Sequence, residues 1–138
     1  NLYAIIYNRM QIQKDREELS RLRSALQGHL TELRKVLKVV FGRSGLVKGN
    51  IYELARKCGK PNCVCNRGQL HRSMVLTWSE KGKSRLLSIP PERLMEVKKR
   101  SEEYLRFRRA RARVTEICRE ILAVMDRIEK LRREEPLR

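Results

Sequence analysis

The sequence predicts a mainly α-helical protein, in which two long helices form an antiparallel coiled-coil hairpin and a small antiparallel β module lies at its tip. Three observations lead to this fold class. Apolar residues recur every seven positions toward both ends of the chain. The middle of the chain has alternating apolar residues between turn formers. Aromatic residues make up only 5% and charged residues 36% of the 138 residues, which favours narrow apolar faces over a large globular core.

The first expected element is a coiled-coil helix within residues 1–43. In a coiled coil, two series of positions, each repeating every seven residues, face the partner helix and form the seam. This segment contains two such series, of which the first is the more apolar. The first series is Ile5, Ile12, Leu19, Leu26, Leu33 and Val40, and the second is Asn8, Asp15, Leu22, His29 and Val36. Gly42 and Gly45 are the expected stop of this helix.

The second expected element is the β module, within residues 44–90. Residues 73–78 and 85–89 are apolar and β-branched runs on either side of a turn that contains Gly82, which is typical of a β-hairpin. Residues 50–54 supply a third strand. A sheet this small needs a covalent or metal staple to be stable.

The third expected element is a second coiled-coil helix within residues 91–138, beginning after Pro90 and Pro91. Its two seam series are Phe107, Val114, Ile121 and Ile128, and Val97, Tyr104, Cys118 and Met125, the latter interrupted by Arg111. We expect His29 and Cys118 to be packing residues, since both fall on seam positions. Leu30, Leu37 and Leu122 widen the apolar stripes beyond one partner helix, which predicts a homo-oligomer.

Three cysteines and one histidine lie within the fourteen residues CGKPNCVCNRGQLH, positions 58–71. Thiolates and imidazole are the ligands that Zn²⁺ collects in closed, tetrahedral structural sites. Gly59, Pro61 and Asn62 allow the chain to reverse between the first two cysteines. The predicted cofactor is therefore one structural zinc ion that staples the β module, with the ligands Cys58, Cys63, Cys65 and His71.

Two alternatives to a metal site stay open, because a Cys-x-Cys spacing is tighter than the paired Cys-x₂-Cys of common zinc sites. The thiols could be free, or two of them could form a local disulfide in an oxidising compartment. A catalytic thiol is disfavoured, since His71 has no identifiable orienting carboxylate nearby in sequence. Paired carboxylates, phosphate loops and nucleophile constellations do not stand out, so we expect a non-enzyme without a small-molecule substrate.

The charge balance points to a polyanionic partner. Lys and Arg number 33 against 16 Asp and Glu, for a net charge of +17, and nucleic acid is the leading partner for such an excess. We expect DNA rather than RNA. Residues 43–93 hold 11 basic and 3 acidic residues, and residues 106–113, RFRRARAR, hold five arginines. The candidate phosphate contacts are Arg56, Lys57, Lys60, Arg67, Arg72, Lys81, Lys83, Arg85, Arg106, Arg109 and Arg113.

The central segments also carry a family resemblance. IYELARKCGKPNCVCNRGQLH, then KGKSR in the hairpin turn, then IPPERLMEVKKRSEEYLRFR resemble an uncharacterised prokaryotic family, a domain of unknown function associated with transposases and other mobile elements. Its most specific motif is Cys-Gly-Lys-Pro-Asn-Cys. The resemblance implies a zinc-ribbon-like tip and no established activity.

These observations lead to one functional expectation and one alternative. We expect a nucleic-acid-binding protein, or an accessory subunit of a nucleic-acid complex, with a structural zinc site. The alternative is a coiled-coil assembly protein that does not contact nucleic acid directly. Apolar runs in the sequence fall well short of the ~20 residues that span a bilayer, so we expect a cytoplasmic protein with no membrane partner.

Overall fold

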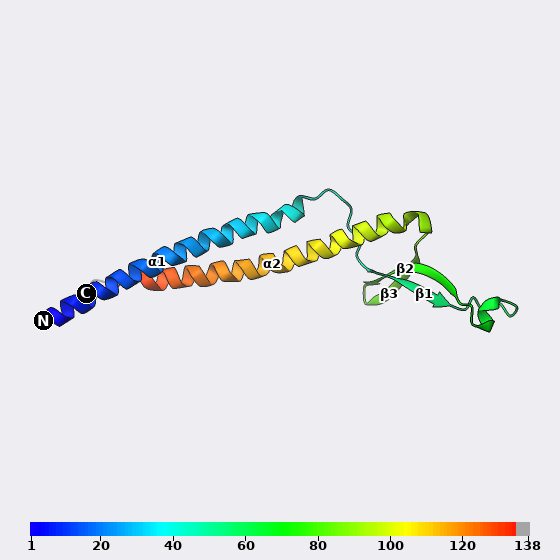
Figure 1. Ribbon diagram of the computed structural model, residues 1–138, viewed down its shortest axis with the longest axis horizontal. Coiled ribbons are helices and arrows are strands. Elements are labelled where there is room, and N and C mark those ends of the chain that lie inside the picture. Colours follow the sequence, from blue (N-terminus) through cyan, green and yellow to red (C-terminus); the bar gives the residue numbers. More distant parts are fainter. Residues whose placement is uncertain (135–138) are drawn as a thin grey trace. The chain divides into compact units, whose positions relative to one another are not determined.

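The computed structural model describes residues 1–134. The chain forms two compact units. The helical unit consists of Asn1–Phe41 and the chain from Arg109 onward, and the sheet unit is Gly42–Arg108. Figure 1 shows the two long helices and the three-stranded sheet. The predicted content of two long helices and a small antiparallel sheet is therefore confirmed.

Helix α1 (Leu2–Leu37) opens the helical unit and is followed by a short 3₁₀ turn, η1 (Lys38–Phe41). The side chain of Asn1 caps α1 by accepting a hydrogen bond from the Tyr3 N–H at 3.1 Å, which satisfies one of the free amide groups at the helix start. Arg34 and Lys35 lie in the last turn, where positive charge suits the negative end of the helix dipole.

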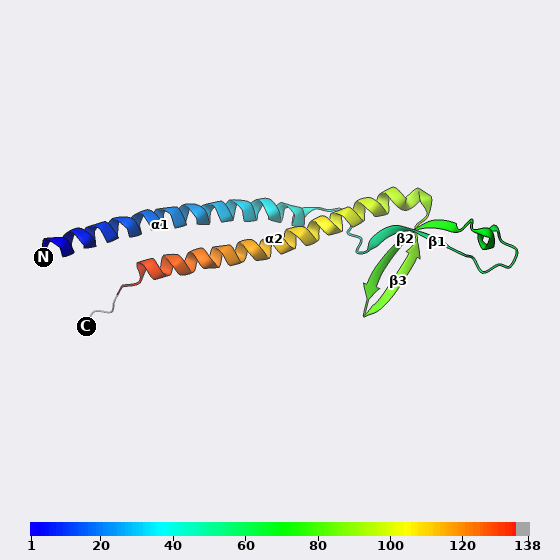
Figure 2. The same ribbon diagram turned by 60° about the horizontal axis from the view of Figure 1, so that its bottom comes forward.

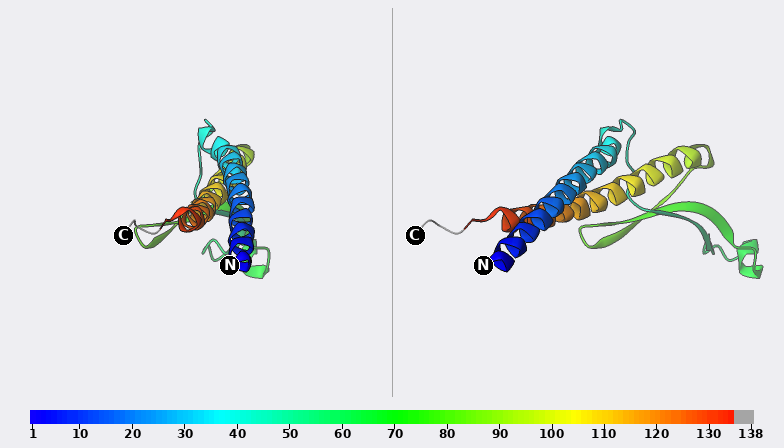
Figure 3. Two further views of the ribbon diagram at one scale, coloured as in Figure 1. Left: turned by 90° about the vertical axis from the view of Figure 1, so that its left-hand side faces the viewer. Right: turned by 60° about the vertical axis from the view of Figure 1, so that its left-hand side comes forward.

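The partner of α1 in the helical unit is the C-terminal part of helix α2 (Leu94–Arg132). Arg127 bonds Glu18 at 2.6 Å and Arg113 bonds Glu32 at 2.8 Å. The contacts advance by 14 residues along α1 while they retreat by 14 along α2, so the two helices run antiparallel. Figure 3 shows these segments side by side. A supercoiled hairpin of the whole chain stays a prediction.

The half-buried positions of α1 between residues 15 and 36 include both predicted seam series. These positions are Asp15, Leu19, Leu22, Leu26, His29, Leu33 and Val36. Residues 1–14 are all exposed, and α1 has no fully buried residue. The apolar face of α1 is thus only partly covered within one chain.

On α2, the two predicted seam series differ in burial, since the second is half-buried at Val97 and Tyr104 but not at Cys118 and Met125. The series from Phe107 to Ile128 is half-buried, but the series beside it is Ala110, Ile117, Val124 and Leu131, in which Ala110 and Ile117 are buried. Cys118 and Met125 are exposed instead. The two series of a coiled-coil seam alternate at steps of three and four residues. Here the step of three follows Phe107, so the second series contains Ala110, and position 118 points away from the partner helix. The expectation that Cys118 is a packed core residue is therefore wrong.

The sheet unit contains three antiparallel strands in the order β1-β2-β3, with β1 at Asn50–Arg56, β2 at His71–Glu80 and β3 at Lys83–Ser88. Figure 2 shows the three strands in this order. Glu80 pairs with Lys83 around a two-residue turn. Both central residues have positive φ, 49° at Lys81 and 75° at Gly82, which is typical of the type I′ turns that match the twist of a hairpin.

The core of the sheet unit lies around β2 and the start of the second helix. Val75, Leu76 and Ile89 are buried. Pro90 ends the strand region, and a 3₁₀ turn, η3 (Pro91–Arg93), leads into α2. The Val47 N–H donates to the Arg100 carbonyl at 3.1 Å, and the hydroxyl of the buried Ser101 donates to the Gly49 carbonyl at 3.3 Å. These two hydrogen bonds hold the segment that leads into β1 against the first part of α2.

Gly49 is required where the chain enters β1. Its φ is +147°, and a β-carbon there would lie 2.6 Å from the Thr77 carbonyl oxygen and 2.7 Å from Leu76 Cδ1. Both the backbone conformation and the space therefore exclude a side chain.

We expect Gly49→Ala to lower the free energy of unfolding of the sheet unit by about 1–3 kcal/mol, the usual range for strain at such a position. Trp78 on β2 provides the fluorescence signal for urea unfolding. Gly45→Ala is the matched control, because the nearest atom to its β-carbon is in the Arg100 side chain at 3.8 Å. Equal unfolding midpoints for the two variants would contradict this account.

Candidate metal centre

The chain between β1 and β2, together with the adjoining ends of both strands, forms a lobe, residues 56–72, which we call the cysteine lobe. Arg56 pairs with His71 as the last residue pair of the β1–β2 ladder, so the lobe leaves and re-enters the sheet at adjacent points. Figure 2 shows it beyond the paired ends of these strands. The strand ladder thus brings Cys58 and His71 close to one another before any metal is considered.

Turn chemistry folds the lobe. Gly59 has φ +81°, and the Cys63 N–H bonds the Lys60 carbonyl at 3.3 Å in a tight turn. A 3₁₀ turn, η2 (Val64–Arg67), follows and ends at Gly68, whose φ is +98°. The Asn66 amide crosses back to the carbonyls of Lys60 and Pro61 at 2.9 and 3.0 Å.

The four predicted ligand side chains converge. Their ligand atoms all lie within 4.8 Å of one another. The sulfurs of Cys58 and Cys65 are 3.6 Å apart, and Cys63 Sγ is 3.1 Å from His71 Nε2. Zn–S bonds of about 2.3 Å in a tetrahedron separate two sulfurs by roughly 3.8 Å. The donor set and its spacing therefore fit a tetrahedral metal ion, and the four residues lie close enough to hold one.

Burial differs among the four ligands. Cys65 is fully buried, Cys63 is half-buried, and Cys58 and His71 are exposed. The Cys58 N–H points at Cys65 Sγ at 3.5 Å. All three thiols of the lobe are free in this structure, with no disulfide between them.

Two thiols have shifted proton affinities. The backbone N–H of Lys60, together with the thiol of Cys63, lowers the pKa of Cys58 to about 7. The Cys65 N–H favours the thiolate of Cys63, but the thiols of Cys58 and Cys65 and partial burial outweigh it and raise the pKa of Cys63. The Cys58 thiolate is thus readily formed near neutral pH, and its negative charge disfavours a second thiolate nearby. A divalent cation bound to the sulfurs would stabilise all three thiolates together.

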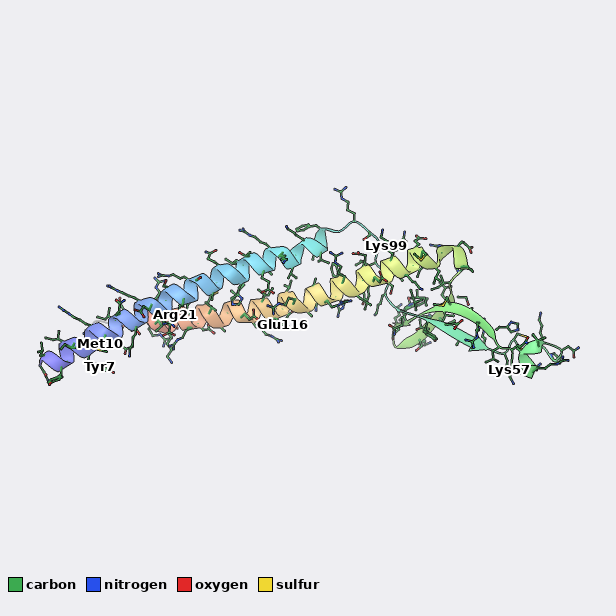
Figure 4. The ribbon with its side chains drawn as sticks, viewed as in Figure 1. Tyr7, Met10, Arg21, Lys57, Lys99 and Glu116 are labelled. Atoms are coloured by element: carbon green, nitrogen blue, oxygen red, sulfur yellow. The ribbon has the colours of Figure 1, made fainter. Side chains whose placement is uncertain are left out.

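The predicted phosphate contacts divide into cations with and without an acidic partner. In the sheet unit, Arg72 bonds Glu53 at 3.1 Å, Arg85 bonds Glu80 at 3.1 Å and Arg106 bonds Glu103 at 3.4 Å. The other predicted contacts of this unit make no ion pair within 4.0 Å in the part of the chain described. These residues are Arg56, Lys57, Lys60, Arg67, Lys81 and Lys83, and Figure 4 labels Lys57.

Arg109 and Arg113 lie in the helical unit, and Arg113 is engaged by three carboxylates. It makes two bonds to Glu32, at 2.8 and 2.9 Å, and further bonds to Glu116 at 2.9 Å and Glu120 at 3.2 Å. The bonds to Glu32, followed by those to the other two carboxylates, raise the pKa of Arg113 further above its usual range. Arg113 therefore joins the two helices, and its charge is largely compensated.

A second cluster of potential ligands surrounds Arg113, and the sequence analysis missed it. His29, Glu32 and Glu120 bring one nitrogen and two carboxylates within 4.8 Å of one another, and His29 Nδ1 is 3.2 Å from Glu120. Arg113 already supplies positive charge there. The sequence signal was the charged residues next to the seam positions of both helices, which are informative only once the antiparallel pairing is known.

Among residues 1–134, neither long helix carries an apolar stretch long enough to cross a bilayer.

A long helical pair, a three-stranded sheet and a Cys₃His cluster on a basic lobe define a small helical protein with a candidate metal-binding β module. The model of a domain of unknown function, DUF6788, matches residues 9–99, and the chain belongs to this family. The match covers most of α1, the sheet, the cysteine lobe and the start of α2. No curated protein and no solved structure matches the chain at a significant level.

We expect protein purified without chelator to carry one zinc ion per chain, because three thiolates and one imidazole complete a closed tetrahedral site. Cys63→Ser should lose most of this metal, measured by elemental analysis of purified protein. Cys118→Ser is the matched control, since Cys118 is exposed on α2 and outside the cluster. Full metal content in Cys63→Ser, or none in the unaltered chain, would contradict the assignment.

Proposed function

We propose that the protein binds nucleic acid, or serves as an accessory subunit in a nucleic-acid complex, through the cysteine lobe. One observation carries the proposal. Between Glu53 and Glu80 the chain contains no acidic residue, and the lobe within this stretch has five basic residues, of which only Arg72 has a carboxylate partner among residues 1–134. The remaining four are Arg56, Lys57, Lys60 and Arg67.

The electrostatics of the lobe support a polyanionic partner. A zinc ion with three thiolates carries a charge of about −1, against five basic side chains in residues 56–72. The lobe therefore stays strongly positive when the site is filled. Four cations of the lobe have no carboxylate partner in the described part of the chain, and contacts of such cations with phosphates contribute affinity without sequence preference.

The role of zinc in this proposal is structural. Cys65 is the only buried apolar residue that the lobe contains, so hydrophobic packing alone does not fix the positions of its cations. A metal ion that holds both ends of the lobe would keep these side chains in place. The resemblance to an uncharacterised family associated with transposases and mobile elements suggests a DNA transaction in the cytoplasm as the setting, with no catalytic step by this chain.

We expect affinity for a generic 20-nucleotide DNA to fall steeply with salt, by roughly one power of salt concentration per phosphate contact. Replacing Lys60 and Arg67 by Ala should flatten the slope of log affinity against log salt by up to about two units. Fluorescence anisotropy titrations at several salt concentrations measure this slope.

The double variant Arg85→Ala and Arg106→Ala is the matched control for charge. It removes the same number of positive charges, but both of its arginines already have carboxylate partners. A similar loss of slope in this control would mean that binding depends on net charge and not on the lobe. Absence of binding at low salt would reject the proposal.

A second candidate function, assembly through the helices, is favoured by the exposure of α1. Its first twelve residues carry seven large exposed apolar side chains, among them Tyr3 at 83% and Tyr7 at 72% exposure. Tyr7 and Met10 are labelled in Figure 4. Among the described residues of the helical unit, only Ala110 and Ile117 are buried. Pairing with a second copy would cover this face and continue the heptad series through Ile5 and Ile12.

Light scattering at tens of micromolar is expected to give a mass of two or more chains. Ile12→Asp should shift the mass toward the monomer, because it places a charge on the uncovered seam. Lys14→Asp is the control, since residue 14 lies on the opposite side of the helix from residue 12. A monomeric mass for the unaltered chain would remove the assembly function.

A further inference from the structure

A basic cavity lies directly beside the candidate metal centre. It has a volume of about 420 Å³ and is lined by Arg56, Lys57, Cys58 and His71. Two of these residues are predicted metal ligands and two are cations without an acidic partner in the described chain. Arg56 and His71 are opposite each other in the β1–β2 ladder, so the strand pairing itself fixes this part of the cavity wall.

The orientation of His71 distinguishes its two ring nitrogens. Nε2 lies 3.1 Å from Cys63 Sγ and is thus the nitrogen that faces the other ligands. When a metal occupies Nε2, the proton of the neutral ring is on Nδ1, which becomes a hydrogen-bond donor. Metal-bound histidines almost always donate this second N–H to an acceptor that orients the ring. Within residues 1–134, no acceptor is hydrogen-bonded to His71 Nδ1.

Acidic side chains near the cavity do not fill this role. The nearest carboxylate in the β1–β2 ladder, Glu53, is engaged by Arg72 at 3.1 Å, and neither residue lines the cavity. An acceptor for the Nδ1 proton must therefore come from outside the lobe. Arg56 and Lys57 select for an anion, and a guanidinium with an ammonium is a typical pair of phosphate ligands.

We propose that this cavity holds one backbone phosphate of the bound nucleic acid and that a phosphate oxygen accepts the Nδ1 proton of His71. Arg56 and Lys57 contact the same phosphate group. The phosphate then takes the place of the carboxylate that commonly supports a metal-bound histidine. This inference rests on the proposed nucleic-acid binding and adds that the metal centre and the phosphate share one side chain.

Sharing His71 makes the two binding events dependent on each other. If phosphate orients the ring for the metal, bound nucleic acid strengthens metal retention, and the metal strengthens nucleic-acid binding by the same factor. Second-layer partners of metal ligands typically change metal affinity 10–100-fold. A coupling of about tenfold is therefore the expected size. Cations elsewhere on the lobe add affinity for nucleic acid without this coupling.

The test uses the full chain loaded with Co²⁺, whose absorption spectrum reports on the ligands of a tetrahedral site, and a mixed-sequence 20-nucleotide single-stranded DNA. We expect saturating DNA to shift the spectrum and to slow metal transfer to a chelator about tenfold in the unaltered chain. The double variant Arg56→Gln and Lys57→Ala should bind metal but lose the spectral shift and most of the tenfold effect.

Lys60→Ala is the matched control, because Lys60 is a cation of the same lobe that does not line the cavity. It should weaken DNA binding and yet keep the spectral shift and the slower transfer at saturating DNA. Binding of DNA with no change in spectrum or transfer, or equal coupling in the cavity variant and the unaltered chain, would overturn this inference and leave the proposed function intact. Absence of DNA binding in every form would overturn both.

Discussion

The convergence of four potential ligand side chains at the end of the β1–β2 ladder is the constraint on which the cysteine lobe depends. Apart from Cys65, residues 56–72 contain no buried side chain. The lobe is closed instead by the strand pair that enters it, by the Asn66 amide and by the Cys₃His cluster. Few apolar contacts hold it, so the position of every cation on its surface follows from polar and ligand contacts.

The same lobe shows why charge and ligand residues occur together in this segment. Three thiolates near one another repel, and the lowered pKa of Cys58 beside the raised pKa of Cys63 reflects this competition. Residues 56–72, which contain these thiols, also contain five lysines and arginines, and nearby positive charge favours the thiolate form of a cysteine.

Much of the fold could be predicted from the sequence, because its signals were local. The strands followed from β-branched runs and a glycine turn, and the clustering of the three cysteines and His71 followed from residue type and spacing. The second seam of α2 could not be predicted in the same way. Ala110 is too small to stand out beside Tyr104 and Met125, and only the antiparallel partner determines which residues face inward. The sequence also could not show which arginines form ion pairs, since Glu32 and Arg113 are 81 residues apart in the chain.

The ion pairs of the helical unit also select one alignment of the two helices. Glu18 with Arg127 and Glu32 with Arg113 define the observed alignment. Sliding α2 by one heptad in either direction would separate Glu18 from Arg127 and Glu32 from Arg113, and in one direction it would place Glu120 opposite Glu18. Each slip keeps the apolar stripes in contact but loses these two interhelical ion pairs. Leucine-rich stripes are tolerant of sliding, so it is the sparse acidic residues of this basic chain that make one alignment preferable to its neighbours.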